Sequence, residues 1–490
     1  MIKKHFTTTE AYKKDTYQKI EPVYSVIQDK LVFSIDQVLD QLKLKDNMTI
    51  SFHHHLRNGD AVLNKIIEHL DNRNLNNITL AASSLFPVHE PIIKAIKKGT
   101  ISKIVTSYLN GPVARAVSQG MLKDQIIMQT HGGRARSIET GEMVIDVAFI
   151  ALSCADKNGN GNGKYGNNAF GPVGYSIADM MYAKQVVVVT DHLVDDVFYP
   201  EIEAKYVDYV LKVDSIGDQA AIVSGTTQIT KDPIGIKIAK DTTKILDLLG
   251  LIKPGFSMQT GAGGVSLAVA SEVYQIMKER NIKGSFISGG ITGYFVKMLE
   301  EDKMDQLYDV QCFDLEAVRS YRENKNHIGM SASKYANPFD SPVVNNLDFT
   351  ILGATEIDVD YNVNVTTDSF GYILGGSGGH ADSAYGAKVT IITTQLMKSR
   401  MPIIKDRVTT ITTPGDSVDI LVTERGISIN PKRVDLINQL KDKIKLSTIQ
   451  ELQETCYRIT GRPVKIEHGD KVIGIIEYRD GSIIDYLYKK

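Results

Sequence analysis

The sequence has few cysteines, no long apolar run and almost no excess charge, and each absence excludes a class of protein. Its three cysteines, Cys154, Cys312 and Cys456, lie far apart without metal-binding spacing, which is typical of reduced thiols. No window approaches the ~18 apolar residues of a membrane span, and the first residues contain no apolar signal segment. We therefore expect a soluble, cytoplasmic protein with no membrane contact.

The charge balance gives no reason to expect a polyanionic partner. The 490 residues carry a net charge of −2, so neither nucleic acid nor an anionic membrane surface is expected to bind. A chain of this length is too long for one compact core, which predicts two or three domains.

Strand and helix patterns alternate along the first half of the chain. Apolar runs at 48–52, 78–82 and 185–190 are separated by stretches with helical spacing, such as 59–70. This alternation predicts parallel βαβ units, and the continuous apolar runs predict strands that are covered on both faces.

The second half repeats this order. SFHHHLRNGDAVLNKIIEHL, from Ser51, corresponds to SMQTGAGGVSLAVASEVYQI, from Ser257, and VAFIALSCADKNGNGN, from Val147, corresponds to FTILGATEIDVDYNVN, from Phe349. The offset stays at about 204 residues, which indicates an internal duplication. The expected fold class is α/β, with two tandem open domains of related topology, mostly parallel sheets and flanking helices.

The predicted organisation has three parts. Residues 1–45 form a polar N-terminal arm, interpreted as lead-in helices or a partner-docking segment, 46–230 a first domain and 240–490 a second. The linker is expected within 229–241, where Pro233 and Gly235 interrupt the pattern. A ligand between two such domains is expected at the carboxyl ends of their strands.

Two glycine-rich segments are the leading candidates for a ligand site. LGGSGGHADSAYGAK, from Leu374, has four glycines within five positions, and QTGAGG, from Gln259, opens an apolar helical pattern. Dense glycines let backbone N–H groups approach a ligand closely, and a helix N-terminus favours anions. The alternatives are a structural hairpin for the first segment and a tight strand–helix turn for the second.

Basic side chains offer contacts for a substrate with several carboxylates. Arg134 and Arg136 lie in the stretch THGGRARSIETGE, and two guanidinium forks suit such a substrate. The alternative is a surface loop in which these arginines pair with Glu139 and Glu142.

Three consecutive histidines, His53, His54 and His55, follow an early strand. Neighbouring residues on a strand point to opposite faces, so the three cannot bind one ion, and we expect no metal site. One or two of them are expected to form hydrogen bonds at the strand end, followed by Arg57 as an anion contact.

Two further segments have ambiguous roles. The Gly/Asn-rich loop 158–174 is interpreted either as a wall of the site or as simple turn structure. Glu356 and Asp358 end a strand and offer carboxylates, but they equally fit a structural cap, because Cys154 and Asp156 occupy the duplicated positions.

Together these motifs resemble the CoA-transferase superfamily. The matching segments are Gln259-Thr-Gly-Ala-Gly for its Q-x-G-x-G helix start, Glu356-Ile-Asp358 with Asn362-Val-Asn364 for E-x-D…N-x-N, Gly376-Ser-Gly-Gly for G-x-G-G, and Val422-Thr-Glu-Arg-Gly426 for V-T-E-x-G. The longer stretches HHHLRNGD, GGRARSIETGE, NGNGNGKYGNNAFG and GGSGGHADSAYGAK resemble the citrate lyase alpha chains over nearly the full length.

This resemblance implies two CoA-transferase-like domains and a citrate:acetyl-thioester transferase, which produces a citryl thioester and acetate. The implied partners are citrate, acetyl-CoA or acetyl-ACP, and the beta (citryl lyase) and gamma (acyl carrier) subunits of citrate lyase. No bound cofactor of its own is implied. The thioester is carried by CoA or by the phosphopantetheine-type, dephospho-CoA-derived arm of the carrier.

The expected roles of individual residues follow from these motifs. Residues expected to bind the thioester carrier are Gly261, Ala262, Gly263, Gly264, Gly375 and Glu356. Expected catalytic residues are Gly376, Gly378, Gly379 and His380, the glycines as backbone donors and the histidine as a donor, a general acid or only a brace. Residues expected to bind substrate carboxylates are His54, Arg57, Arg134 and Arg136.

One departure from the superfamily bears on the mechanism. Relatives that share the Q-x-G-x-G start have a glutamate, in a segment like G-I-H-T-E-M-I-S-D-G, that forms a covalent acyl-CoA intermediate. Ser285 occupies this position here, and a serine cannot form the corresponding anhydride and thioester. We therefore expect a citrate carboxylate to attack the acetyl thioester directly, giving a mixed anhydride.

Four alternatives stay open. They are the same chemistry on another acid such as malonate, a covalent transferase that uses Glu356, a non-catalytic subunit that binds the carrier arm, and a sugar-phosphate isomerase or sensor domain on the related fold. The sequence does not indicate how many copies assemble.

Overall fold

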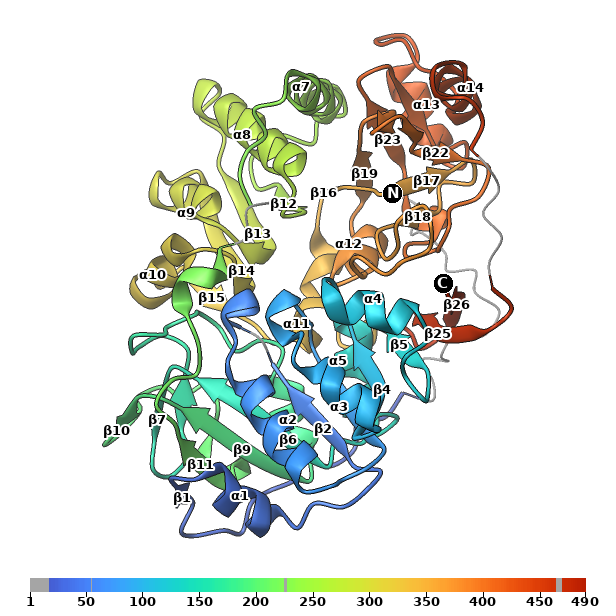
Figure 1. The fold of residues 1–490 in the computed structure, drawn as a ribbon. Coiled ribbons are helices and arrows are strands. Elements are labelled where there is room, and N and C mark those ends of the chain that lie inside the picture. The colour runs from blue at the N-terminus through green and yellow to red at the C-terminus, as the bar shows by residue number, and fades with distance from the viewer. Residues whose placement is uncertain (1–16, 54, 224–226, 464–468) are drawn as a thin grey trace.

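Two large sheets, each flanked by helices, form the two halves of the molecule (Figure 1). The structure, a computed structural model, describes residues 17–53, 55–223, 227–463 and 469–490. The first 16 residues of the predicted arm, and the predicted substrate ligand His54, therefore lie outside the described residues.

The first half is built on a sheet with the strand order β1-β11-β9-β6-β2-β3-β4-β5-β25-β26. Its strands from the first half of the chain are β1 (Leu31–Val32), β2 (Thr49–Phe52), β3 (Ile78–Ala82), β4 (Ile101–Thr106), β5 (Ile126–Met128), β6 (Val147–Leu152), β9 (Gln185–Thr190) and β11 (Tyr209–Lys212). Its helices are α1 (Ile35–Leu42), α2 (Val62–Asn72), α3 (Ile92–Lys98), α4 (Pro112–Ser118), α5 (His131–Glu139) and α6 (Ile177–Tyr182).

The second half is built on a sheet with the order β15-β14-β13-β12-β16-β19-β23-β24. Its strands are β12 (Ser257–Thr260), β13 (Gly284–Ile291), β14 (Met304–Cys312), β15 (His327–Gly329), β16 (Phe349–Leu352), β19 (Val389–Thr393), β23 (Ile420–Thr423) and β24 (Gly426–Ile429). Its helices are α7 (Pro233–Leu248), α8 (Gly264–Glu279), α9 (Gly293–Glu300), α10 (Leu315–Glu323), α11 (Ala332–Ala336), α12 (His380–Gly386), α13 (Val434–Leu440) and α14 (Ile449–Thr460).

The two sheets correspond strand for strand, which confirms the predicted α/β fold with two halves of related topology. The run β5-β4-β3-β2-β6-β9-β11 matches β15-β14-β13-β12-β16-β19-β23, and all of these neighbours pair in parallel. Smaller sheets repeat as well: β7 (Cys154–Asp156) with β8 (Gly161–Asn162) and β10 (Leu193–Val194), and β17 (Glu356–Asp358) with β18 (Val363–Asn364) and β22 (Ile404–Lys405). A short hairpin, β20 (Met397–Lys398) and β21 (Met401–Pro402), completes the second half.

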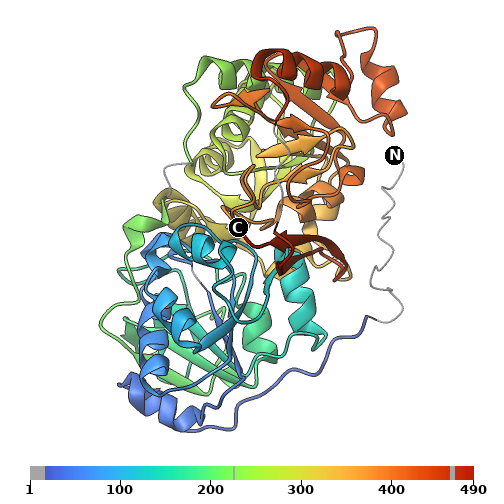
Figure 2. The same cartoon turned by 45° about the vertical axis from the view of Figure 1, so that its right-hand side comes forward.

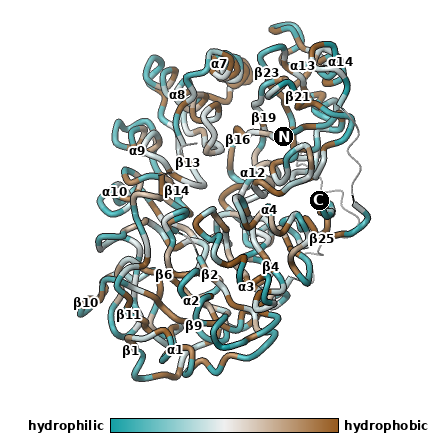
Figure 3. The backbone as a smooth tube through the Cα atoms, in the orientation of Figure 1, coloured by the Kyte–Doolittle hydropathy of each residue, from teal (hydrophilic) through white to brown (hydrophobic). Residues whose placement is uncertain are grey.

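Apolar stretches run through the interior strands of both halves, and hydrophilic loops surround them (Figure 3). All six residues of β6 are buried, as are five of the six in β9. Both faces of these strands are covered, because successive side chains point to opposite faces and yet nearly all are buried.

Both ends of the described chain attach to the first sheet. At the C-terminal end, the hairpin β25 (Val472–Glu477) and β26 (Ile483–Tyr488) returns to the first half, where β25 pairs in parallel with β5 (Figure 2). At the N-terminal end, β1 pairs in parallel with β11. The first sheet thus draws strands from both sides of the predicted boundary between 230 and 240, while that boundary itself stays a prediction.

The predicted linker at 229–241 is wrong in one respect, because helix α7 begins inside it at Pro233. Asp232 caps the helix, accepting hydrogen bonds from the backbone N–H groups of Ile234 and Gly235. Proline is well suited to the first position of a helix, where its missing N–H would have no partner. Among the helices of the described residues, none is long and apolar enough to cross a membrane.

Candidate active site between the two halves

The first glycine-rich segment lies directly against the first half of the molecule. The N–H of Leu109 donates to the carbonyl of Gly375 at 3.2 Å, and the N–H of His131 donates to the carbonyl of Gly378 at 2.9 Å. Leu109 and His131 follow the carboxyl ends of β4 and β5, so the segment joins the halves at this edge of the first sheet (Figure 1). We call this contact region the junction.

Close packing explains the glycines of this segment. A Cβ atom on Gly376 would lie 2.4 Å from the carbonyl oxygen of Ser107, and one on Gly379 would lie 2.2 Å from the Tyr335 hydroxyl. A larger residue at Gly376 would push the two halves apart, and one at Gly379 would displace Tyr335 within the second half. These glycines were predicted to allow a close approach of the backbone to a ligand. In the structure the groups that approach them closely are Ser107 and Tyr335 of the protein.

The same segment also leaves backbone donors uncommitted. The N–H groups of Gly376, Ser377 and Gly379 make no hydrogen bond with any described residue, whereas those of Gly375 and Gly378 bond to backbone carbonyls. Gly376 and Gly379 are only partly buried. These donors fit the predicted role of binding an oxyanion, which stays a prediction.

The second glycine-rich segment forms the N-terminus of α8. The N–H of Gly261 donates to Ile351 at 2.8 Å, and Gly263 is the N-cap, with no side chain to bond the first turn. The N–H groups of Gly264 and Val265 have no acceptor within the described parts of the chain. Unpaired donors and the dipole of this 16-residue helix favour a negatively charged group here.

Gln259 connects the two glycine-rich segments. Its side-chain amide donates to the Tyr335 hydroxyl at 2.7 Å and accepts from the Ser288 hydroxyl at 3.0 Å, so the amide is held in one orientation. The Tyr335 oxygen in turn lies against Gly379. The two glycine-rich motifs, far apart in the sequence, are thus physically connected across the second half and into the junction.

Arg57 is the predicted substrate ligand that reaches the junction. Its guanidinium lies 4.7 Å from the ring centre of Phe313, in the second half, and 5.7 Å from that of Phe86, in the first. One nitrogen donates to the carbonyl of Ile222 at 3.3 Å. Within the described residues, no carboxylate pairs with this half-buried cation, and burial lowers its pKa.

The backbone of Arg57 is held in the left-handed region, with φ of 55°. This conformation costs a non-glycine residue roughly 1–2 kcal/mol. Strain of this kind persists where the surroundings fix it and is common at ligand sites. It therefore supports a functional position for the Arg57 side chain.

Polar aromatic residues line the junction beside Arg57. Tyr108 and Tyr175 both interact electrostatically with its guanidinium. Tyr108 also packs against Gly376, and the Tyr175 hydroxyl lies 3.2 Å from Nε2 of His131. Burial, reinforced by Arg134, lowers the pKa of His131 to about 3, so this imidazole is neutral at physiological pH.

The other two predicted substrate arginines lie inside the first half, where each binds a carboxylate of the protein. Arg134 donates to both oxygens of Asp179, at 2.8 and 2.9 Å, and His53 lies 3.2 Å from the same carboxylate. Burial opposes ionisation of Asp179, but Arg134 and His53 outweigh it and hold its pKa far below the ordinary value. Arg134 is thus a buried ion-pair residue.

Arg136 is fully buried and pairs with Glu142 at 2.6 Å and with Glu477, of the C-terminal hairpin, at 3.6 Å. The alternative interpretation, a surface loop with paired ions, is wrong about the loop, because the stretch forms the buried helix α5, but its pairing of Arg136 with Glu142 is confirmed. Thr130 caps that helix by accepting from the N–H of Gly133 at 2.8 Å. Direct citrate contacts of Arg134 and Arg136 stay predictions that this geometry does not favour.

Glu356 is enclosed by donors from its own half. It pairs with Lys405 and accepts from Asn364 at 3.0 Å, Ser369 at 2.6 Å and the backbone of Thr409 at 2.7 Å. Burial opposes its ionisation, but Lys405 and these donors outweigh it and lower the pKa. The geometry fits the structural alternative, and its predicted role toward the thioester carrier stays untested.

His380 is braced on both ring nitrogens. Nδ1 lies 2.8 Å from the Thr413 hydroxyl, and Nε2 lies 2.9 Å from the carbonyl of Gly353, to which it donates. Burial lowers its pKa to about 4, although the Gly353 carbonyl favours protonation. A neutral imidazole with both nitrogens engaged matches the bracing alternative, so a general-acid role stays a prediction.

Asp382 is a junction residue to which the sequence assigned no role. It accepts from the Thr130 hydroxyl and from the N–H of Gly132, each at 3.0 Å, and Arg479 lies 3.3 Å away. Burial raises its pKa to about 6 against the opposing effect of Arg479. Its position two residues after His380, in the glycine-rich segment, was the one sequence signal for a role. Its partners could not be predicted, because they are far away in the chain.

Ser285 does not lie at the carboxyl edge of the second sheet. It occupies the second position of β13, and its hydroxyl donates to the carbonyl of Phe256 at 3.0 Å. The carboxyl end of that strand is formed by Gly290 and Ile291. At about 3.3 Å per residue, Ser285 is roughly 16 Å from Gly290.

Comparisons with known proteins agree along the whole chain. The family model described as "Citrate lyase, alpha subunit (CitF)" matches residues 28–490. The citrate lyase alpha chain of Klebsiella pneumoniae is 42% identical over 463 residues, covering 94% of this chain and 91% of that protein. The citrate lyase alpha chain of Escherichia coli K12 is 41% identical over 463 residues, with the same two coverages, 94% and 91%.

Solved structures show the same relationship. The putative alpha subunit of citrate lyase from Streptococcus mutans, crystallised in complex with citrate, superimposes with a TM-score of 0.93 at 42% identity, over 99% of this chain and 95% of that one. The malonate decarboxylase alpha subunit of Acinetobacter baumannii shares the fold, with a TM-score of 0.64 at 16% identity over 91% and 89% of the two chains. The match to one family model over residues 28–490, together with identities above 40%, shows that this chain belongs to the citrate lyase alpha subunit family.

Proposed function

We propose that this chain transfers an acyl-carrier or CoA thioester from acetyl to citrate, giving a citryl thioester and acetate. The observation that carries the proposal is Arg57, a half-buried cation with no carboxylate partner among the described residues, near Tyr108, which packs against the glycine-rich segment at Gly376. Citrate offers the carboxylates that such a guanidinium binds. The citrate complex of the Streptococcus mutans relative supports the same ligand.

The reaction proceeds in two steps that need no carboxylate from the protein. A citrate carboxylate oxygen attacks the acetyl carbonyl and expels the thiolate, which forms an acetyl–citryl anhydride. The thiolate then attacks the citryl carbonyl and expels acetate, which keeps the bridging oxygen that citrate supplied.

The protein supports these steps by positioning and by electrostatics. Arg57 holds a carboxylate that does not react, and such positioning contributes on the order of 7–11 kcal/mol in favourable cases. The N–H groups of Gly376 and Gly379, or those at the start of α8, donate to the oxyanion of each tetrahedral intermediate. One such donor is worth roughly 3–4 kcal/mol.

Three buried carboxylates, one in the junction and one inside each half, are already engaged, which supports direct attack by citrate. Asp382 is bonded to Thr130 and Gly132, and Asp179 and Glu356 are paired with Arg134 and Lys405. None of the three is available as a nucleophile without breaking a buried pair.

The proposal extends to the assembly. The thioester is delivered by the gamma (acyl carrier) subunit, whose phosphopantetheine-type, dephospho-CoA-derived arm reaches the junction, and acetyl-CoA replaces it in the test tube. A beta (citryl lyase) subunit consumes the citryl thioester, and the complex works in the cytoplasm. The chain needs no bound cofactor of its own.

The direct test mixes the purified chain with acetyl-CoA and citrate and identifies the products by mass spectrometry. Citryl-CoA and free acetate are expected in equal amounts, and malonate in place of citrate is expected to give little product. If no exchange occurs with acetyl-CoA or with the acetylated carrier, the chain is a non-catalytic carrier-binding subunit.

A variant at Ser285 tests the mechanism separately. Because its hydroxyl bonds only to Phe256 at the amino end of β13, Ser285→Ala is expected to retain transfer at nearly the native rate. Loss of transfer with a native fold would show that this serine takes part in the chemistry.

A further inference from the structure

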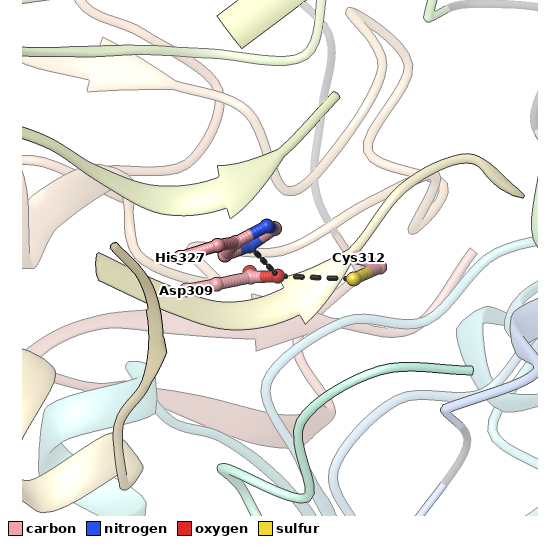
Figure 4. A group of neighbouring side chains, drawn as sticks. All are labelled: Asp309, Cys312 and His327. Carbon is pink, nitrogen blue, oxygen red and sulfur yellow. Dashed lines mark hydrogen bonds and ion pairs between the residues drawn. The ribbon is translucent and has the colours of Figure 1, made fainter. Parts of the chain in front are cut away.

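Three metal-binding side chains converge at the edge of the second sheet, outside the contacts assigned to citrate. Asp309 and Cys312 lie near the carboxyl end of β14, and His327 begins the neighbouring strand β15. Figure 4 shows the three side chains pointing toward one another. All three are buried, with at most 3% of each residue exposed.

One carboxylate oxygen is the meeting point of this cluster. Oδ2 of Asp309 accepts from the Cys312 thiol at 3.0 Å and lies 3.1 Å from Nε2 of His327. One ligand atom from each residue lies within 4.8 Å of the others. The thiol and the imidazole both face the carboxylate, so they do not form the nucleophile–base pair of a cysteine enzyme.

The outer atoms of the same residues are held in place by further contacts. Nδ1 of His327 lies 3.0 Å from the Ser320 hydroxyl, and Oδ1 of Asp309 accepts from the N–H of Gln311 at 2.8 Å. Metal-binding histidines and carboxylates are generally oriented by hydrogen bonds of this kind on the atom that does not face the metal.

We propose that Asp309, Cys312 and His327 bind a divalent transition metal, with zinc as the best match. Thiolate, imidazole and carboxylate are the three ligand types of zinc in proteins. Ligand atoms around a tetrahedral zinc lie roughly 3.3–3.7 Å apart, given bonds of about 2.0–2.3 Å. The thiol and the imidazole therefore need to move a few tenths of an ångström away from Oδ2 of Asp309, and the distance between the sulfur and the ring nitrogen, which is within 4.8 Å, closes to the tetrahedral value.

Charge balance favours this occupant. A dication bound by one carboxylate and one thiolate gives a neutral buried site, whereas the carboxylate alone leaves a negative charge in the protein interior. Binding releases the thiol proton to solvent. The proton on Nε2 of His327 is replaced by one on Nδ1, which then donates to Ser320.

A further buried acceptor accompanies the cluster. The buried carboxylate of Glu201 interacts electrostatically with Cys312 and Asp309, and it accepts hydrogen bonds from the N–H of Val173 at 3.1 Å and from the Tyr321 hydroxyl. In a site with three protein ligands the fourth position is taken by water.

The metal would brace one wall of the junction. Cys312 directly precedes Phe313, whose ring lies under the guanidinium of Arg57. Sequence spacing gave no signal for this site, because His327 is brought to the other two ligands only by the pairing of β14 with β15.

The test measures metal content, so its outcome is independent of the transfer reaction. The full chain is produced with added zinc, freed of loose metal by gel filtration and analysed by elemental mass spectrometry. About one zinc per chain is expected. Cys312→Ser and His327→Gln are each expected to lose it, while Cys456→Ser, which changes another buried thiol that donates to a backbone carbonyl, retains it.

A second measurement covers the case in which a ligand variant does not fold. The unsubstituted chain is stripped with a chelator and titrated with Co²⁺, and a thiolate-to-cobalt charge-transfer band in the near ultraviolet is expected. Absence of zinc together with absence of this band overturns the proposal. Equal zinc content in Cys312→Ser, His327→Gln and the unsubstituted chain also overturns it, because the metal then lies elsewhere.

Discussion

Replacing Arg57 by glutamine removes the cation that we propose binds citrate. The side chain stacks against Phe313 and Phe86. Among the described residues it donates one hydrogen bond, to the carbonyl of Ile222. Its remaining donors are therefore available to a carboxylate, and Arg57→Gln keeps much of the side-chain volume while removing the charge.

The magnitude follows from the kind of bond that is lost. A hydrogen bond to a charged group contributes about 1.5–3 kcal/mol. At about 1.4 kcal/mol for each factor of ten, the KM for citrate is expected to rise roughly 10- to 150-fold. The KM for acetyl-CoA is expected to stay nearly constant, because Arg57 is not among the residues expected to bind the thioester carrier.

The assay is steady-state transfer, with acetyl-CoA and citrate varied in turn, accompanied by calorimetric titration of citrate to separate binding from turnover. Arg115→Gln is the matched control, because Arg115 is exposed and also stacks on an aromatic ring, that of Tyr372 at 5.2 Å. An unchanged citrate affinity in Arg57→Gln, or an equal loss in Arg115→Gln, would refute the assignment.

Four other substitutions, one of them a control, separate structural from functional roles. Arg134→Gln is expected to lower the free energy of unfolding by about 3–5 kcal/mol in chemical denaturation, because it leaves Asp179 buried without its cation; an altered citrate KM with unchanged stability would contradict this. Gly376→Ala is expected to abolish transfer, since its Cβ would lie 2.4 Å from Ser107, whereas Gly263→Ala meets no atom within 4 Å and is expected to fold normally in a thermal melt. In the folded protein the pKa of Asp382 is about 6, above its ordinary value of about 3.9. Its contribution to stability is therefore present below pH ~4 and is lost as the pH rises through 6. The free energy of unfolding is expected to fall by roughly 3 kcal/mol over this range. Asp382→Asn is expected to lack that slope in denaturation curves recorded between these two pH values, and an identical slope would argue against the assignment.

The fold was predictable because its signals are local. Apolar runs such as QVVVVT at Gln185–Thr190 form buried strands in any parallel sheet, and the duplication gave every such signal twice. The start of α7 carried a local signal as well, since Asp232 followed by Pro233 is a favourable cap and first position. The proline was interpreted there as an interruption.

The site was only partly predictable, because its decisive contacts are not local. The sequence predicted Arg57 as an anion contact, but the aromatic ring on which its guanidinium stacks, that of Phe313, comes from the other half of the chain. Arg134 was expected to bind a substrate. Its actual partner, Asp179, is 45 residues away, and no nearby sequence feature indicates this pairing. Likewise, no local pattern indicates that β25 returns to pair with β5 and brings Arg479 to Asp382.

A single-turnover reaction with citrate labelled by ¹⁸O in its carboxylates tests most directly whether this chain transfers the thioester without a covalent intermediate. Excess enzyme is mixed with acetyl-CoA and the labelled citrate, and acetate, citryl-CoA and the intact protein are weighed by mass spectrometry. Direct attack by citrate predicts acetate with one ¹⁸O atom, equimolar citryl-CoA and a protein of unchanged mass. Unlabelled acetate together with a CoA adduct on the protein would contradict it, because the bridging oxygen would then come from a carboxylate of the enzyme.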